Sequence, residues 1–444
     1  MLSKPKYSPQ LGMFSGLADQ LDQQHPLYQL ANKINWTIFE DSFKVHYSEK
    51  MGKPSKPIRL MVSLLILKYV RNLSDENVVD QWSENLYFQY FSGEQHFQSK
   101  IPCVPTELVA FRHRIGEPGV ELILQESIRV NNPPDDTHGN VVSVDTTVQE
   151  KNITYPTDDK LYKKIIKKCW VIADKENMDL RQSYRRTVRK LGHVQRFKGT
   201  KNGAKAARKA NKKIQIIAGR LVRELARKLP LELLGIYLGD LKLFQRVLSQ
   251  KRGDSNKIYS LHEPNVKCYS KGKEHKKFEF GSKASILVDQ RTGIIMGAVN
   301  FTDTLHDSKT IPEVLEQYER INGKEAKEVF VDRGYKGISQ YKSTKIFAPK
   351  PDKNITRTKR MKHSRRAAIE PVIGHLKADY RLGRNFLKGI LGDNMNLMLA
   401  AAAMNFKRVM NLWRTEANFC WSLIYKIFLG AYRDFFAPKL KMTF

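Results

Sequence analysis

Apolar positions in the first third of the chain recur at helical spacing, which predicts an all-helical region over residues 56–135. Ile58–Val70 and Asp75–Asn85 each form a predicted helix, preceded by a residue that favours a helix start. Thr106 can cap a third helix, with Arg112–Arg114 on its exposed side. Short helices with basic faces are typical of helix-turn-helix DNA-binding units, and a plain helical scaffold is the alternative.

After residue 140 the pattern changes to short β-branched runs separated by turns and helical segments. Gln290–Gly293 is a hairpin turn between two of these runs, and Asp307–Ile321 and Leu397–Met410 have helical spacing. Three strands, a helix, two strands and a helix are the order expected of an RNase H-like α/β domain. The predicted strands are Val141–Val148 with an extension at Ile153–Tyr155, Ser282–Asp289, Ile294–Phe301, Glu328–Asp332 and Lys345–Ala348.

A long basic segment, residues 158–250, interrupts the strand pattern. Residues 181–230 contain 17 Lys or Arg and one acidic residue, Glu224. Ala204–Ala210 and Ile214–Leu229 predict an amphipathic helix with most of its charge on one face. Such a surface would neutralise phosphates without reading bases, and its affinity would fall steeply with salt. A solvated charged face is the alternative, although such faces normally mix both signs.

The composition indicates a polyanionic partner. The 444 residues carry a formal net charge of +32 and have a pI of about 9.8, which points first to nucleic acid, although a ribosome-like or simply basic protein shares this property. Four scattered cysteines without metal-binding spacing predict reduced thiols in a cytosolic protein. The N-terminus has no signal-peptide pattern, and the longest apolar runs are too short for a membrane span.

Two of the predicted strands carry an aspartate at or near their end. Asp145 follows the apolar run Val141–Val144, and Asp332 follows Glu328–Val331. A β-branched run that ends on Asp places a carboxylate at the edge of a sheet, where it faces a cleft. For either residue alone, an Asp that caps a turn is the alternative reading.

A third acidic residue lies in a predicted helix near the C-terminus. Arg366, Glu370 and Lys377 are spaced i, i+4 and i+11, which places them within about 40° of one another around a helix. Pro371 would clash inside a helix, so the helix either begins near Glu370, with Arg366 on the incoming loop, or kinks there. Charge pairs on a solvated helix are the alternative, but two strand-end Asp and a helical Glu can converge on a pair of metal ions.

These motifs resemble those of DDE transposases of bacterial insertion sequences, specifically the insertion-sequence-five type within the insertion-sequence-four superfamily. The resemblance spans about residues 30–415. Arg366, Glu370 and Lys377 fit the superfamily signature Tyr-x2-Arg-x3-Glu-x6-Lys, whereas His363 stands at the position of the Tyr. The matching segments are Val144–Lys151, Tyr155–Asp158, Lys271–Gly281, Asp332–Gly337 and Arg365–Lys377.

The resemblance implies metal-dependent DNA cleavage and strand transfer, with Asp145, Asp332 and Glu370 as ligands of two Mg²⁺ ions about 3.5–4 Å apart. Carboxylate oxygens suit Mg²⁺, for which Mn²⁺ can substitute. Arg333, Arg366 and Lys377 would contact DNA phosphates. The implied partners are the terminal inverted repeats and the target DNA, with a homodimer in the active complex, no membrane, and a cytoplasmic, nucleoid-associated location in a bacterium.

The hydrophobic pattern and the family resemblance together predict the domain organisation of the chain. It has a flexible arm (1–30), a helical domain that binds DNA ends (31–135), an RNase H-like catalytic domain (136–415) with a basic helical insertion at about 158–255, and a C-terminal tail (416–444).

Three other functions are alternatives. An RNase H-like nuclease would cut DNA without joining it, and a regulator derived from a transposase would bind DNA without turnover. A serine or tyrosine recombinase would need a covalent nucleophile, and no Ser or Tyr stands in a recognisable setting for one.

Overall fold

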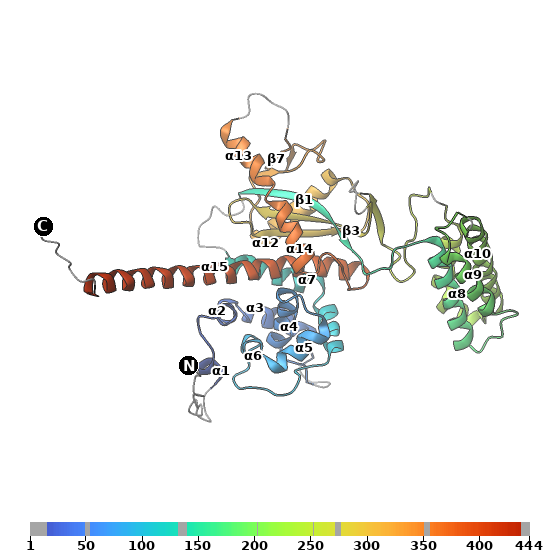
Figure 1. Ribbon diagram of the computed structural model, residues 1–444, viewed down its shortest axis with the longest axis horizontal. Coiled ribbons are helices and arrows are strands. Elements are labelled where there is room, and N and C mark those ends of the chain that lie inside the picture. Colours follow the sequence, from blue (N-terminus) through green and yellow to red (C-terminus); the bar gives the residue numbers. More distant parts are fainter. Residues whose placement is uncertain are drawn as a thin grey trace, which may run out of the picture.

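The computed structural model describes residues 16–48, 54–131, 140–201, 203–251, 253–270, 277–349 and 356–436, with side chains as far as residue 415. A helical N-terminal part, a mixed β-sheet and a separate helical bundle make up the chain, and one long helix runs between the first two (Figure 1). Of the predicted segments, the first half of the arm (1–15), part of the 271–281 motif (271–276) and the last residues of the tail (437–444) lie outside the described residues.

The N-terminal part consists of short helices packed around α4 (Ile58–Val70), whose side chains are almost all buried. The next helix, α5 (Asp75–Glu84), is capped by Ser74, whose Oγ accepts a hydrogen bond of 3.0 Å from Asn77 N–H. The other N-terminal elements are α1 (Leu17–Gln20), α2 (Pro26–Lys33), α3 (Thr37–Phe43), η1 (Lys44–His46), α6 (Leu86–Phe91) and α7 (Pro105–Asn131).

Two details of α7 differ from the prediction. The helix begins at Pro105, so Thr106 lies inside it and does not cap it. Arg112 is buried, and its two Nη atoms each lie 3.1 Å from an oxygen of Asp75. The predicted basic exposed face is therefore wrong at Arg112, because a guanidinium can be buried when a carboxylate pairs with it.

The segment expected to be a flexible arm up to residue 30 is helical from Leu17 onwards. Leu17, Leu27 and Leu30 are buried, and α2 packs against α6 and the C-terminal helix. Burial of these leucines offsets the entropy lost when the segment becomes ordered, so for residues 17–30 the predicted flexible arm is wrong.

The sheet has seven strands in the order β2-β3-β1-β5-β7-β6, with β4 paired to β3. β3 runs antiparallel to β1 and β4, whereas β1, β5 and β7 are parallel, and the predicted α/β class is confirmed. The helix α12 (Ile311–Asn322), preceded by η2 (Asp307–Thr310), packs on β4. The strands are β1 (Val141–Glu150), β2 (Lys267–Ser270), β3 (Phe278–Asp289), β4 (Ile295–Phe301), β5 (Glu328–Phe330), β6 (Gln340–Tyr341) and β7 (Thr344–Phe347).

The predicted strand extension at Ile153–Tyr155 is wrong, because the chain leaves the sheet there. Only Lys151 continues the pairing, through an isolated bridge to Asn385. The next residues lead into the helical bundle.

The C-terminal helix α15 (Gly389–Phe436) is longer than the predicted Leu397–Met410 and continues into the segment expected to be a tail. It packs against α7, α4 and α2 on one side and against β4 on the other. Its alanines and methionines join side chains of the N-terminal helices and of the sheet in one continuous hydrophobic core.

The basic insertion forms its own bundle of α8 (Asp158–Lys175), α9 (Arg185–Arg196), α10 (Gly203–Lys228) and α11 (Leu231–Ser249). These helices pack chiefly against one another, around a second hydrophobic core that includes Ile165, Leu221 and Phe244. Figure 1 shows the bundle beyond one end of the sheet. No described helix is long and apolar enough to cross a membrane, and Cys103, Cys169 and Cys268 are free thiols.

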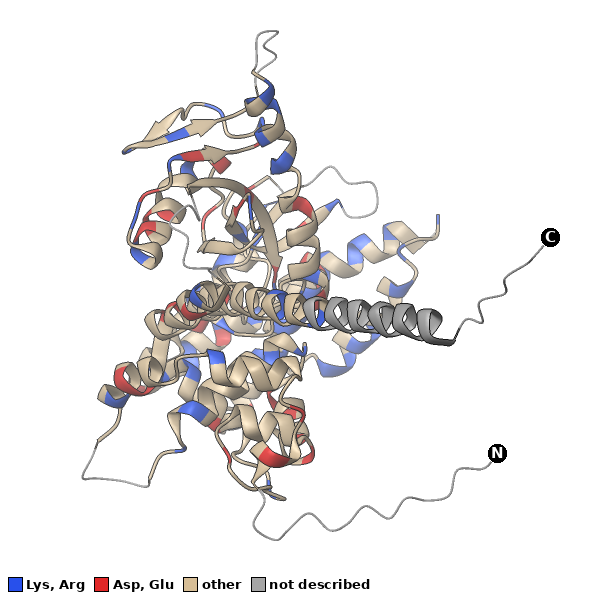
Figure 2. Ribbon diagram, turned by 90° about the vertical axis from the view of Figure 1, so that its left-hand side faces the viewer, with Lys and Arg blue, Asp and Glu red and all other residues tan. Residues whose placement is uncertain are grey.

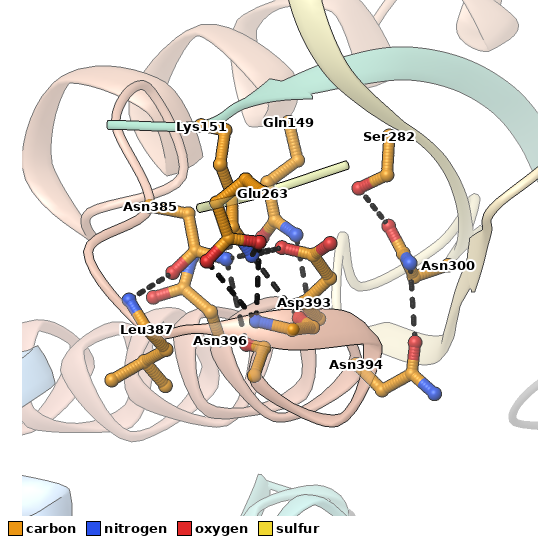
Figure 3. A network of polar contacts seen from close by, with 12 residues as sticks. Gln149, Lys151, Glu263, Ser282, Asn300, Asn385, Leu387, Asp393, Asn394 and Asn396 are labelled. Atoms are coloured by element: carbon orange, nitrogen blue, oxygen red, sulfur yellow. Dashed lines mark hydrogen bonds and ion pairs between the residues drawn. The ribbon is translucent and has the colours of Figure 1, made fainter. Parts of the chain in front are cut away.

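A buried polar network ties the base of this bundle to α15 (Figure 3). Lys151 Nζ, at the end of β1, lies 2.5 Å from Asp393 Oδ1 and 3.4 Å from Glu263 Oε2, and it donates to Gly389 O at 3.1 Å. Both Glu263 oxygens accept from Gly389 N–H at 3.2 Å, and Asn385 donates to Asp393 Oδ1 at 2.6 Å. The network therefore joins the segments on either side of the insertion to the first turn of α15.

Candidate active site

Asp145 and Asp332 lie at the same edge of the sheet. β1 and β5 are neighbouring parallel strands, and their register pairs Ser143 with Phe330. Two residues further along each chain, this register places Asp145 opposite Asp332. Asp145 lies midway along β1, just beyond the point where β5 stops pairing with this strand, and Asp332 follows the end of β5. The two carboxylates therefore become neighbours at this edge although they are far apart in sequence.

The environment of Asp145 disfavours its charge. Its side chain is 19% exposed, and its Oδ1 accepts a hydrogen bond of 2.7 Å from Thr146 N–H. Burial raises the pKa of Asp145 to about 6, and the negative charges of Asp332 and Asp307 add to this, partly opposed by Thr146 N–H and Arg366. A cation beside Asp145 would relieve this penalty.

Asp307 is a third carboxylate at the site that the sequence interpretation missed. Its Oδ1 accepts hydrogen bonds from Thr146 Oγ1 at 2.8 Å and from Lys283 Nζ at 2.7 Å. Burial alone would raise the pKa of Asp307, but the hydrogen bonds from Lys283 and Thr146 hold it below its ordinary value. Asp307 lies shortly after β4, at the start of η2, and no local pattern in the sequence indicates that it reaches this site.

Gly334 allows Asp332 to lie close to Asp307. Its N–H donates to Asp332 Oδ1 at 2.7 Å. A Cβ atom at this position would stand 2.9 Å from Asp332 Oδ1 and 3.5 Å from Asp307 Oδ2, so a larger residue would displace the Asp332 carboxylate. Beneath these groups lies the buried ring of Tyr335, whose pKa is raised well above its ordinary value by burial and by the surrounding carboxylates.

Glu370 stands just after a break between two helices. α13 (Arg357–Arg366) ends at Arg366, and α14 (Ile369–Asp379) begins three residues later, so Glu370 and Pro371 occupy its first turn. Proline is tolerated there because the first N–H groups of a helix have no partner within it. The helix therefore begins near Glu370, and Arg366 does not share its face.

The Arg366 guanidinium lies between two carboxylates. Nη1 is 3.9 Å from Asp145 Oδ2, and Nη2 is 3.7 Å from Glu370 Oε1. Both distances exceed hydrogen-bond length, so the attraction is electrostatic. The Glu370 side chain is 67% exposed. Asp145 and Asp332 thus share one edge of the sheet, while Glu370 lies on the far side of Arg366.

The other predicted DNA contacts are distributed around this edge. Lys377 Nζ, on α14, lies 3.6 Å from Glu279 Oε1 on β3, whereas Arg333 is exposed beside Asp332. His363 packs edge-on against Phe330, with ring centroids 4.9 Å apart. Burial, together with Arg366 and Lys359, lowers the pKa of His363, so this residue in the tyrosine position is neutral at pH 7.

The donor set suits a hard divalent cation at Asp145 and Asp332. Carboxylate oxygens are the ligands that Mg²⁺ and Mn²⁺ prefer, and the raised pKa of Asp145 reports negative charge that lacks compensation. Among the described residues, no group of three or more His, Cys, Asp or Glu side chains is close enough to hold one metal ion. Glu370 is therefore not in place as a shared ligand in this conformation.

Comparisons with known proteins identify the family. The family described as "Transposase domain (DUF772)" matches residues 15–114, and the family described as "Transposase DDE domain" matches residues 254–406. The chain is also 37% identical over 205 residues to the uncharacterized protein ORF8 in the nfe locus of Rhizobium meliloti, covering 43% of this chain and 98% of that protein. No solved structure matches.

The two family matches cover the N-terminal helices and most of the sheet with α13, α14 and the start of α15, whereas α8–α11 lie outside both. Members of the DDE family generally use divalent metal ions, which agrees with the carboxylates at the sheet edge. The chain belongs to the DDE transposases of bacterial insertion-sequence type.

Proposed function

We propose that this transposase cleaves DNA at the ends of its insertion sequence and joins the 3′-hydroxyl ends to target DNA. The observation that carries this proposal is the neighbouring pair Asp145 and Asp332 at the edge of β1 and β5, linked to Glu370 through Arg366. We further propose that the catalytic part is RNase H-like, because antiparallel β4-β3-β1 is followed by parallel β5 and β7. The insertion-sequence-five subfamily is part of the same proposal.

Asp145, Asp332 and Glu370 are the proposed ligands of two Mg²⁺ ions. When bound there, the ions supply Lewis-acid activation of water or of a 3′-hydroxyl, and they stabilise the leaving oxygen. Asp145 must lose its proton to serve as a ligand, and Thr146 N–H supports the charged form. Thr146 Oγ1 and Lys283 hold Asp307 beside this pair, so we propose Asp307 as a positioning residue.

Arg366 is proposed to exchange its carboxylate contacts for a DNA phosphate. Its two contacts of 3.7 and 3.9 Å are longer than hydrogen bonds, so little interaction energy is lost when it turns towards a phosphate oxygen. Once Arg366 moves, Glu370 and Asp145 face each other without a cation between them. Arg333 and Lys377 are proposed to bind phosphates on either side.

The proposed partners of the chain are DNA and a second copy of the chain. The N-terminal helices would bind the terminal inverted repeats, and two copies of the chain would pair the two DNA ends. A cytoplasmic, nucleoid-associated location follows from this substrate.

The test is a cleavage and joining assay with Mg²⁺ on DNA that carries the element's own ends, comparing wild type with Glu370→Ala. We expect metal-dependent 3′-end cutting and joining in wild type and a loss of about 1,000-fold or more in the variant, with end binding retained. Asp379→Ala, at the other end of α14, is the matched control and should keep its activity.

Other outcomes identify the alternatives. Cutting without joining would indicate a nuclease, and binding without cutting would indicate a regulator derived from a transposase. Full activity in Glu370→Ala would show that Glu370 is not a ligand.

A further inference from the structure

The helical insertion carries a basic groove that the chemistry proposed above does not use. We propose that this groove binds the sugar-phosphate backbone of duplex DNA and holds the DNA on which the acidic edge of the sheet acts. This inference rests on the proposed function, because it takes DNA as the substrate.

Two adjoining pockets form the groove, between α8, α9 and the start of α10. Their volumes are about 470 and 460 Å³, and both are lined by Asp159 and Gln195. The basic lining residues are Lys163, Arg189, His193, Arg196, Lys198 and Arg208.

The groove cations lack acidic partners. Within the part of the chain that the structure describes, none of the six forms an ion pair. Three acidic residues of the same bundle are paired elsewhere: Asp240 with Lys168, Asp174 with Arg185, and Glu224 with Lys228, at 2.8–3.1 Å. Asp159 is the one acidic residue among the described lining residues. Unpaired cations at this density favour an anionic ligand.

Gln195 makes the groove a shaped site rather than a bare charged surface. It is 8% exposed, and its Nε2 donates to Asn211 Oδ1 at 2.8 Å. Its Oε1 is buried and has no hydrogen-bond partner in the described structure. An unsatisfied buried acceptor costs about 1–3 kcal/mol. Because the DNA backbone has no hydrogen-bond donor, a bridging water would donate one hydrogen to Gln195 Oε1 and the other to a phosphate oxygen.

The spacing of the cations matches a DNA strand. Arg189, His193 and Arg196 are spaced i, i+4 and i+7 on one face of α9. Seven residues of helix span about 10.5 Å, and one strand of B-DNA presents about three phosphates over that axial length. The remaining cations extend this surface across the groove onto α8 and α10, and Figure 2 shows Lys and Arg along the helices of this bundle, at the back of that view.

The bundle that carries the groove is joined through the chain to the proposed active site. The segment that enters α8 leaves β1, the strand of Asp145, and the Lys151 network fixes both ends of the insertion to α15. DNA held on the bundle is therefore tethered to the same strand that carries the acidic edge. Neither family match covers α8–α11, so this role does not come from the matched segments.

The experiment measures binding of the full chain to a short duplex of arbitrary sequence, by fluorescence anisotropy in EDTA over a series of salt concentrations. The test variant combines Arg189→Gln, Arg196→Gln and Arg208→Gln. We expect affinity to fall by about tenfold or more, and the slope of log K against log salt to become shallower by about 2–3.

The control variant has the same change in net charge outside the groove. It combines Arg223→Gln, Arg227→Gln and Lys242→Gln, three exposed residues that line neither pocket of the groove. Equal loss in the two variants, with equal thermal stability, would overturn the groove proposal while leaving the transposase proposal intact. Absence of DNA binding by wild type would overturn both, and lack of cleavage with groove-dependent binding would overturn only the proposed chemistry.

Tighter binding of RNA or of anionic vesicles than of duplex DNA would also contradict the proposal. Binding should not distinguish the element's ends from other duplexes through this groove, because phosphates carry no sequence information.

Discussion

The charge cluster around Lys151 and the carboxylates at the sheet edge differ in how their charges are compensated. At the base of the insertion, Lys151 lies between Asp393 and Glu263, and the carboxylates accept further hydrogen bonds from Asn385 and Gly389. At the sheet edge, burial and the negative charges of Asp332 and Asp307 raise the pKa of Asp145, and Arg366 stands beyond hydrogen-bond distance.

The comparison contrasts a structural cluster with the proposed catalytic one. Buried charges that pair within the protein hold segments together, whereas carboxylates left partly uncompensated destabilise the fold until a cation arrives. The following predictions test this difference, from the largest expected effect to the smallest.

The largest effect is expected from Lys151→Met. Removal of the ammonium leaves Asp393 and Glu263 buried without their cation, and burial already raises the pKa of Asp393. We expect a loss of about 3–5 kcal/mol in the free energy of unfolding, measured by urea denaturation.

Lys44→Met is the control for this change. Lys44 pairs with Asp41 at 2.9 Å, but the two side chains are 68% and 72% exposed. The loss should stay below about 1 kcal/mol. Similar losses in both variants would show that the Lys151 network does not stabilise the fold more than a surface pair does.

Asp145→Asn should stabilise the folded protein, whereas Lys151→Met destabilises it. Asparagine can still accept from Thr146 N–H, but it carries no charge to be desolvated. We expect the metal-free variant to be more stable than wild type by roughly 1–3 kcal/mol at pH 7.5, as measured by thermal unfolding in EDTA. Asp41→Asn, at an exposed position, should change stability by a few tenths at most.

The difference in unfolding free energy between Asp145→Asn and wild type should depend on pH. The pKa of Asp145 is about 6 in the folded protein and 3.8 without the fold, so the folded state holds this proton more tightly. Its contribution to stability is therefore present below about pH 4 and is lost as pH rises to about 6. The advantage of Asp145→Asn should grow across this window and stay constant above pH 7; a constant difference from pH 4 to 7 would contradict the shifted pKa.

The smallest effect is expected from Arg366→Gln. Its contacts with Asp145 and Glu370 are 3.9 and 3.7 Å long, so unfolding free energy should change by less than about 1 kcal/mol. DNA cleavage should nevertheless fall, with full-chain stability as the control measurement. A loss as large as that of Lys151→Met would mean that Arg366 is a structural cation and would remove the distinction between the clusters.

Features of the molecule that depend on a few neighbouring residues could be predicted from the sequence. Asp145 was found because it follows the short apolar run Val141–Val144, and Asp332 because it follows the run Glu328–Val331. The helix start near Glu370 follows from Pro371. Arg112 was misassigned because its partner Asp75 lies on another helix, 37 residues away. Asp307 was missed because only the folded sheet brings it to Thr146, 161 residues away in the chain.

The helical start at Leu17 was also missed for a physical reason. The side chains that cover α2 come from α6 and from α15, near opposite ends of the chain, and no local pattern reveals them. The predicted domain boundaries at 135 and 415 follow composition, but the hydrophobic core crosses the first of them and α15 runs through the second.

The position of α15 has a consequence for the order of events during synthesis. Because this helix contributes Ala400, Ala401 and Phe406 to the core shared by the N-terminal helices and the sheet, neither part can bury its apolar surface while the ribosome is still making residues before 389. Until then the N-terminal helices and the sheet remain in partly open states, in which exposed apolar surface invites aggregation. The bundle α8–α11, which has its own core, is the part of the chain able to complete its packing while translation continues.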